Sequence, residues 1–170
     1  PELTEIWRFR EEWERHASLR LRLGDRDVIE EYDLHDRIVG GDHDPMLDAA
    51  YVGWLDDTAR GKSSLMIAET NESVTALNVR ARLDRIEAGL VDDSTAVRLH
   101  DGSEASPGDL VVTRQNDRRV RYGKSWVKNG DLWAVVGTHA DGSVDLRPIG
   151  AERGSVRLHA SYVAEHLELA

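Results

Sequence analysis

The chain has 170 residues, a hydrophobic content of 40%, five tryptophans and a formal net charge of −10. This length suits one ordinary domain or a domain with a small insertion, and the hydrophobic content excludes global disorder although 32% of the residues are charged. The absence of cysteine excludes disulfides and thiolate metal sites, and the net negative charge excludes wholesale coating by nucleic acid, so any contact with phosphates must be local. No apolar run approaches the roughly 18 residues of a membrane-spanning helix and no signal-peptide pattern begins the chain, so we expect a cytoplasmic protein without membrane contact.

The N-terminal half is predicted to alternate strands and helices. The expected elements are a strand over 3–9, helices over about 11–23, 27–37 and 44–60, a strand over 64–68, and a helix that Asn71 caps. Gly24, Gly61 and Gly89 are suited to end three of these helices, because glycine adopts the left-handed conformation without steric cost. Asp44 and Pro45 are suited to the N-cap and the first helical position.

The helix after Asn71 carries one apolar stripe. The stripe consists of Ala76, Val79, Leu83 and Ile86. We expect these residues to face the core. The order of strand, helices, strand and helix indicates an α/β fold, with a parallel sheet and crossover helices.

After Gly89 the pattern changes to short alternating apolar runs. They cover 96–99, 109–114, 132–138, 143–148 and 154–158. Asp101-Gly102, Asn129-Gly130 and Asp141-Gly142 separate several of them, and such dipeptides are strong indications of hairpin turns. This half is therefore predicted to form a small antiparallel β-barrel. A short helix and a return strand are expected at the end of the chain.

The segment 108–133 concentrates positive charge in an acidic chain. It holds six Lys and Arg against three Asp, a local charge of +3, so the rest of the −10 chain carries −13. The cations are Arg114, Arg118, Arg119, Arg121, Lys124 and Lys128, and they surround Tyr122 and Trp126. Cations interleaved with aromatic rings are typical of surfaces that hold single-stranded nucleic acid. The alternative is a solvated hairpin whose charges only prevent edge-to-edge pairing.

Two short motifs are similar to a phosphate-binding loop and to a metal site, but neither meets the requirements of that site. Gly61-Lys62-Ser63 ends like a phosphate loop, yet position 56 is Asp where that loop needs glycine, and a helix precedes it where a strand is required. Asp42-His43-Asp44 offers metal-binding side chains, but three adjacent residues of extended backbone cannot all point at one ion. We therefore expect no metal site.

The segment GDLVVTRQNDRRVRYGKSWVKNGDLWAVV (108–136) resembles the pattern "GD-x-V-…-R-N-…-NGD-x-…-V" of RecD-like superfamily 1 DNA helicases. It is most similar to the form found in actinobacterial conjugative relaxase–helicases. In that family the segment opens a small β-barrel inserted into the second RecA-like motor domain. The resemblance implies a partial RecA-like parallel sheet with flanking helices over 1–104, completed by a return strand over 164–170, and an inserted small antiparallel β-barrel over 105–163.

The resemblance also implies roles for individual residues. LTEIWRF (3–9) is similar to a helicase motif whose arginine, here Arg8, reaches the γ-phosphate of ATP. SLMIAETNESVTAL (64–77) is similar to a helicase strand followed by a helix, which would place Thr70 and Asn71 near the translocating strand. VAEHLELA (163–170) resembles the return strand.

The implied function is a fragment of an ATP-dependent DNA helicase and conjugative relaxase. The parent would bind ATP and Mg²⁺, and the partners would be single-stranded DNA and the remainder of the parent. The chain carries no Walker A or B motif and no relaxase histidine triad. We therefore expect the fragment alone to bind no cofactor and to be inactive, and its orphaned sheet edge to allow a non-physiological dimer. The alternatives are a non-enzymatic interaction module, whose basic barrel binds a protein or nucleic-acid partner, and a structural spacer.

Overall fold

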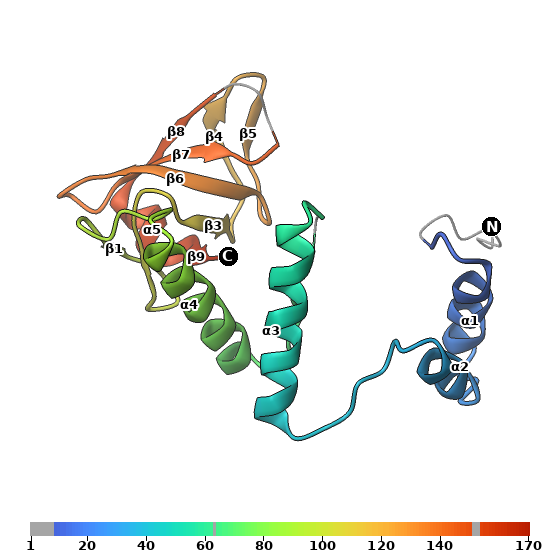
Figure 1. The fold of residues 1–170 in the computed structure, drawn as a ribbon. Helices are drawn as coiled ribbons and strands as arrows, with labels where there is room; N and C mark the ends of the chain where they lie inside the picture. The colour runs from blue at the N-terminus through green and yellow to red at the C-terminus, as the bar shows by residue number, and fades with distance from the viewer. Residues whose placement is uncertain (1–8, 63, 151–153) are drawn as a thin grey trace. The chain divides into compact units, whose positions relative to one another are not determined.

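The computed structural model describes residues 9–62, 64–150 and 154–170, so that Arg8 and nearly all of the strand predicted over 3–9 lie outside the described residues. The chain divides into an N-terminal unit up to Leu65 and a C-terminal unit from Met66 (Figure 1). Each unit is described by itself below.

The N-terminal unit begins with two helices, α1 (Glu12–Arg22) and α2 (Val28–Leu34). Ala17 and Val28 are fully buried, and Trp13 stacks on His35 with ring centroids 3.8 Å apart. Gly24 separates the helices with a φ of +81°, which confirms the predicted end of α1. The second helix is shorter than predicted because Asp36 adopts a left-handed conformation, with a φ of 54°, and ends it.

The third helix, α3, spans His43–Ala59. Its N-cap is Asp42, so the prediction of Asp44 as the N-cap is wrong. The amide of Met46 donates to the carbonyl of Asp42, and Pro45 lies in the first turn, where its missing N–H costs no helical hydrogen bond. Gly61 follows the helix with a φ of +71°, as predicted for its C-terminal end.

The strand predicted over 64–68 does not form. Described residues 64–68 have no regular secondary structure, and Leu65 and Ile67 are 81% and 86% exposed. An apolar run becomes a strand only when another strand satisfies its backbone groups, and no such partner is present among the described residues. Every pairing between described strands is antiparallel, so the predicted RecA-like parallel sheet is absent from this part of the chain.

The C-terminal unit starts with helix α4 (Asn71–Glu87) and continues as antiparallel β-structure (Figure 1). Its strands are β1 (Val97–Arg98), β2 (Glu104–Ala105), β3 (Leu110–Thr113), β4 (Asp117–Tyr122), β5 (Ser125–Val127), β6 (Leu132–Thr138), β7 (Val144–Pro148), β8 (Val156–Leu158) and β9 (Leu167–Leu169). Helix α5 (Ala160–His166) lies between the last two strands in sequence. Gly102, Gly130 and Gly142 all have a φ between +82° and +84°, which confirms the predicted turns.

Five strands form one sheet in the order β8-β7-β6-β3-β9, and β1–β2 and β4–β5 form two separate ribbons. A strand forms at the predicted return position as β9, but it pairs antiparallel with β3 through the register Val111 to Leu169, so the prediction that it completes a RecA-like parallel sheet is wrong for the described residues. Val111, Trp133 and Leu146 are fully buried in the core that this sheet covers. The antiparallel character is as predicted. The described strands do not form the predicted closed barrel, because β8 and β9 are the two edges of the five-stranded sheet.

Helix α4 buries a different face from the one predicted. Val79 and Leu83, members of the predicted stripe, are 41% and 57% exposed, whereas Leu77 is buried. Arg82 and Arg85 lie on the buried side and bond to the start of β3. Apolar periodicity was misleading here because the β-structure presents hydrogen-bonding groups, rather than an apolar surface, to the helix.

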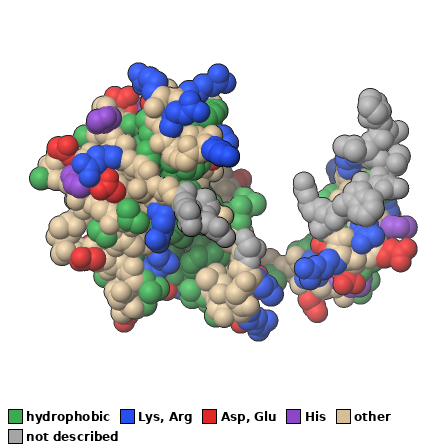
Figure 2. Space-filling view, turned by 90° about the horizontal axis from the view of Figure 1, so that it is seen from above, with side chains coloured by type: hydrophobic (Ala, Val, Ile, Leu, Met, Phe, Trp, Pro, Cys, Tyr) green, Lys and Arg blue, Asp and Glu red, His purple; other side chains and the backbone are tan. Residues whose placement is uncertain are grey.

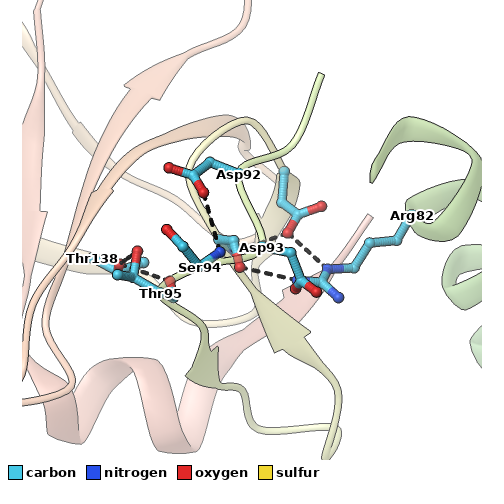
Figure 3. A network of polar contacts seen from close by, with 8 residues as sticks. Arg82, Asp92, Asp93, Ser94, Thr95 and Thr138 are labelled. Carbon is cyan, nitrogen blue, oxygen red and sulfur yellow. Dashed lines mark hydrogen bonds and ion pairs between the residues drawn. The ribbon is translucent and has the colours of Figure 1, made fainter. Parts of the chain in front are cut away.

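A polar network joins α4 to the β-structure. The Arg82 Nε lies 2.8 Å from the Asp109 Oδ2, and its Nη2 lies 3.0 Å from the Ser106 Oγ and 3.1 Å from the Asp93 Oδ1 (Figure 3). The Asp109 side chain is only 1% exposed. One turn earlier in the helix, the side-chain amide of Asn78 donates to the carbonyl of Leu169 over 2.9 Å. These bonds hold α4 at one position on the β-structure.

Gly108, next to Asp109, is required by the same junction. Its φ is +102°, and a Cβ atom built there would lie 2.1 Å from the carbonyl oxygen of Leu90. Its own carbonyl accepts a 2.8 Å hydrogen bond from the Arg85 Nη2. The Gly-Asp pair that opens the 108–136 segment is thus explained by local packing: the glycine permits close approach of the backbone, and the aspartate binds Arg82.

Candidate nucleic-acid interface

The predicted basic surface forms around the β4–β5 ribbon. Its two strands are joined through Gly123, with a φ of +55°, and a register shift between Asp117 and Arg121 interrupts their pairing. Five cationic side chains of the ribbon and its flank are exposed: Arg118, Arg119, Arg121, Lys124 and Lys128. Figure 2 shows Lys and Arg side chains gathered at the top of the C-terminal unit. Below, "the basic ribbon" means residues 117–128, which comprise β4, the turn with Lys124, β5 and Lys128.

The three carboxylates of the 108–133 segment are each engaged locally. Asp109 binds Arg82. Asp117 contacts the Arg119 guanidinium at 3.1 Å, and this hydrogen bond lowers the pKa of the Asp117 carboxyl. Asp131 accepts a 2.9 Å hydrogen bond from the backbone N–H of Lys128. The acids in the segment therefore neutralise only a part of its positive charge, which leaves the basic ribbon cationic.

Trp126 lies between cations. The Arg118 Cζ is 5.3 Å and the Lys128 Nζ 5.7 Å from the centre of its ring, distances typical of cation–π contacts. These contacts hold two long, flexible side chains close to the strand. Another flat ring could stack on a face of Trp126 that a cation covers only if that cation moved aside.

Tyr122 points towards the core rather than along the basic ribbon. It is half-buried and meets Trp133 edge to face, with ring centroids 4.8 Å apart. Trp133 is fully buried and donates through its Nε1 to the Thr113 Oγ1 at 3.3 Å. Tyr122 thus anchors the ribbon on the five-stranded sheet.

Arg114 precedes the ribbon and is tied to the sheet. Its Nε lies 2.6 Å from the Glu168 Oε2 on β9, and half of its side chain remains exposed. A phosphate at this position would compete with Glu168 for the guanidinium.

Thr70 and Asn71 lie at the N-terminal end of α4, on a different element from the basic ribbon. The prediction of Asn71 as the cap is wrong by one residue, because Thr70 is the N-cap and its Oγ1 accepts a 3.2 Å hydrogen bond from the amide of Ser73. Asn71 is exposed in the first turn. The Thr70 hydroxyl is therefore already engaged in capping the N-terminal end of α4.

The two motifs set aside in the sequence have ordinary local contacts. The Lys62 Nζ lies 2.6 Å from the Asp57 Oδ1, which lowers the pKa of Asp57, and the His43 Nδ1 lies 3.0 Å from the Asp44 Oδ1. Within the described ranges, no group of three or more His, Asp or Glu side chains is arranged to hold a metal ion. None of the helices in the described part of the chain is both long and apolar enough to cross a bilayer.

A cavity that the sequence did not predict adjoins the basic ribbon. Its volume is about 480 Å³, and it lies between the start of β4 and helix α5. Arg118 and Arg119 line one side, and His159, Tyr162 and His166 line another. No sequence motif marks it, because its walls come from segments about 40 residues apart.

Comparisons with known proteins identify relatives in bacterial conjugation. No family model and no solved structure matches the chain. The conjugal transfer protein TraA of Agrobacterium fabrum is 33% identical over 138 residues, which cover 79% of this chain and 12% of that protein. The conjugal transfer protein TraA of Rhizobium radiobacter is 32% identical over 158 residues, or 91% of this chain and 14% of that protein. A probable conjugal transfer protein TraA of Sinorhizobium fredii is 31% identical over 79% of the chain. The chain is therefore related to conjugal transfer proteins, and it spans less than one sixth of the length of each of these relatives.

Proposed function

We propose that this chain is one segment of a conjugative relaxase–helicase and that its basic ribbon binds single-stranded DNA. Two independent observations support the proposal. The related proteins are named for conjugal transfer, a process that handles DNA, and their similarity extends over 79–91% of the chain. On the ribbon, exposed cations cluster around the partly exposed ring of Trp126, although the chain as a whole is acidic. The cluster carries the argument, because the relatives alone would not indicate which surface binds.

Binding would combine phosphate contacts with ring stacking. Arg118, Arg121 and Lys124 are exposed on the ribbon and can each approach a phosphate, which releases condensed counterions. Trp126 offers a ring to a base, and the two cations beside it would then move to the neighbouring phosphates. Tyr122 would support this surface from below.

We further propose that the whole parent is an ATP-dependent helicase located in the cytoplasm. In that protein Arg8 would contact the γ-phosphate of ATP, and Thr70 and Asn71 would contact the tracked strand. ATP and Mg²⁺ would be held by other parts of the parent, since Gly61-Lys62-Ser63 follows a helix and Lys62 is paired with Asp57. The support for these roles is the helicase resemblance of the segments 3–9 and 64–77.

The DNA-binding proposal is tested by fluorescence anisotropy with a labelled oligothymidylate over a salt series. Each phosphate neutralised on a single strand adds about −0.7 to the slope of log affinity against log salt. Replacing Arg118, Arg119 and Arg121 together with Ala should therefore flatten the slope by roughly 2 if all three make contacts. The matched control replaces Arg22, Arg26 and Arg37, three exposed arginines of the N-terminal unit, and should keep the wild-type slope. Superimposable slopes for both triple variants would exclude the ribbon as the DNA site and favour an interaction module.

The helicase proposal is tested in the full-length parent with the substitution Arg8→Ala. Arginines that clamp a transferring phosphate contribute about 10³–10⁵ in turnover, so ATP hydrolysis should fall by about 10³-fold or more. Nucleotide affinity should fall much less, because most of the nucleotide would be bound elsewhere. Near-normal turnover would remove Arg8 from the mechanism and leave the DNA-binding proposal untouched.

A further inference from the structure

The cavity beside the basic ribbon has the dimensions of a site for a small ligand. Its volume of about 480 Å³ falls within the range of roughly 300–1,000 Å³ that is usual for such sites. The walls are the loop before β4, β4 as far as Val120, the end of β8 with the following His159, and one side of α5. All of these belong to the C-terminal unit.

One wall of the cavity is apolar and held in place. It is formed by Val120, Leu158 and Tyr162. Leu158 is fully buried in the core, and Val120 packs against that core. The Tyr162 hydroxyl donates to the carbonyl of Gln115, and its ring meets His166 edge to face with centroids 5.2 Å apart. Since Leu158 is fully buried and only supports the wall, Val120 and Tyr162 present the accessible surface to a flat aromatic or heterocyclic ligand.

The rest of the lining offers both donors and acceptors, and it includes the carboxylates of Asp117, which binds Arg119, and of Glu165, which lies 3.6 Å from the His166 Nε2. The Asn116 Oδ1 accepts a 3.0 Å hydrogen bond from the backbone of Asn129, which fixes the amide and leaves its NH₂ group for other partners. His159 and the Ser161 hydroxyl lie on the α5 side. Amide, imidazole and hydroxyl groups match the mixed hydrogen-bonding edges of nucleobases.

Two cationic residues belong to both the cavity and the basic ribbon. Arg118 and Arg119 line the cavity, and both are exposed on β4. The Arg119 guanidinium is oriented by Asp117, with two contacts of 3.1 Å, while 91% of its side chain remains exposed. Positive charge therefore lies at the rim, where the phosphates of a bound nucleotide would be.

We propose that this cavity accepts one unstacked base of single-stranded DNA, while the flanking phosphates lie on the basic ribbon. This inference rests on the proposed DNA binding and names a base-specific part of the same surface. A single strand meets little cost for turning one base out, because no pairing has to be broken. The base would lie against Tyr162, with its polar edge towards Asn116 and His159.

The direct test is an NMR titration of the ¹⁵N-labelled 170-residue chain. Thymidine 5′-monophosphate is compared with 2-deoxyribose 5-phosphate, which has the same charge and sugar but no base. The amide signals of Asn116, Leu158 and Ser161 should shift with the nucleotide and not with the sugar phosphate at equal concentration. Equal shifts with both ligands, or no shifts with the nucleotide, would overturn the base site.

A pair of variants on one helix links the cavity to DNA binding. Ser161→Trp fills the cavity, whereas Ala164→Trp places the same bulk at an exposed position of α5 that does not line it. Stacking is worth about 1–3 kcal/mol per base, so Ser161→Trp should weaken oligothymidylate binding about five- to 150-fold and keep the salt slope, because the phosphate contacts persist. Ala164→Trp should bind like the wild type.

The outcomes separate the two proposals. If the salt slope is present and the two variants bind equally well, the base site is wrong and DNA binding by the ribbon stands. If the wild-type chain shows no salt-dependent binding of the oligonucleotide, the proposed function fails, and a DNA base is no longer the occupant of the cavity.

Discussion

The Arg82–Asp109 pair and the basic ribbon both consist of charged side chains, but they use charge in opposite ways. In the pair, side-chain exposure is 13% for Arg82 and 1% for Asp109, and each group has further hydrogen bonds to Ser106. In the ribbon, the cationic side chains are exposed and outnumber the acidic ones. A buried charged side chain needs an oppositely charged or hydrogen-bonding partner within the chain. A charged side chain without such a partner is stable only where water or a binding partner solvates it.

The difference separates residues that hold the fold from residues that are available for binding. The segment 108–136 contains both, a few residues apart, so resemblance over this segment does not by itself indicate a binding site. Its Gly-Asp start is explained by the junction with α4. The exposed cations in the middle of the segment take no part in the contact with α4. Substitutions can test whether stability depends on the start of the segment and binding on its middle.

The largest effect is expected at the buried pair. Removing one partner of a buried ion pair leaves an uncompensated charge and typically costs about 3–5 kcal/mol, so Arg82→Ala and Asp109→Ala should each destabilise the C-terminal unit by that amount. The double variant should cost clearly less than the sum of the two, because neither charge is then left alone. Hydrogen exchange of the Val135 amide, which bonds to the carbonyl of Asp109, reports on this region. Strictly additive costs would show that the two side chains act independently.

A smaller effect is expected at Gly108. Left-handed or otherwise sparsely populated backbone costs a non-glycine residue about 1–3 kcal/mol, and Gly108→Ala adds a collision with the carbonyl of Leu90. Gly89→Ala is the matched control, because Gly89 has a φ of +69° and open space around it. Urea unfolding followed by circular dichroism should show a larger loss for Gly108→Ala. Equal losses of unfolding free energy in the two variants would mean that the positive φ alone requires glycine at position 108, without a contribution from the contact with Leu90.

The next effect concerns binding rather than stability. Trp126→Ala should weaken oligonucleotide binding by about 1–3 kcal/mol and leave the salt slope nearly unchanged, because stacking releases no counterions. The same anisotropy series measures both quantities. A flatter slope in this variant would indicate that Trp126 acts mainly by holding Arg118 and Lys128 in place.

The sequence predicts the local features of this chain better than those that depend on distant partners. The glycines that end helices and close hairpins, such as Gly24 and Gly130, are where they were expected because a positive φ is a local requirement. The strand over 64–68 failed because pairing needs a second strand. Similarly, the buried side of α4 could not be inferred from periodicity, since Asp109, the partner of Arg82, lies 27 residues further along the chain.

The candidate site follows the same rule. The cations of the basic ribbon were predicted from composition, and they are exposed as that prediction requires. The inward orientation of Tyr122 depends on Trp133 and could not be predicted from the local pattern. The cavity was not predicted at all, because Tyr162 and Arg118 are brought together only by the folded sheet.

The smallest effect on stability is expected when the arginines of the basic ribbon are replaced. This is the strictest test of the contrast between the buried Arg82–Asp109 pair and the exposed ribbon. Ion pairs in contact with solvent are worth about 0–1 kcal/mol. In the Arg119–Asp117 contact 91% of the arginine side chain is exposed, and the Asp117 carboxylate, which is 14% exposed, keeps its hydrogen bond from the backbone N–H of residue 119 when the side chain is removed. Replacing Arg118, Arg119 and Arg121 with Ala should therefore change the free energy of unfolding by less than about 0.5 kcal/mol per site, while the DNA affinity falls. Urea unfolding of the same protein sample that is used for anisotropy makes the two measurements comparable. If the triple variant lost as much stability as Asp109→Ala, the ribbon would be a structural element like the α4 junction, and its loss of DNA binding would follow from unfolding rather than from lost phosphate contacts.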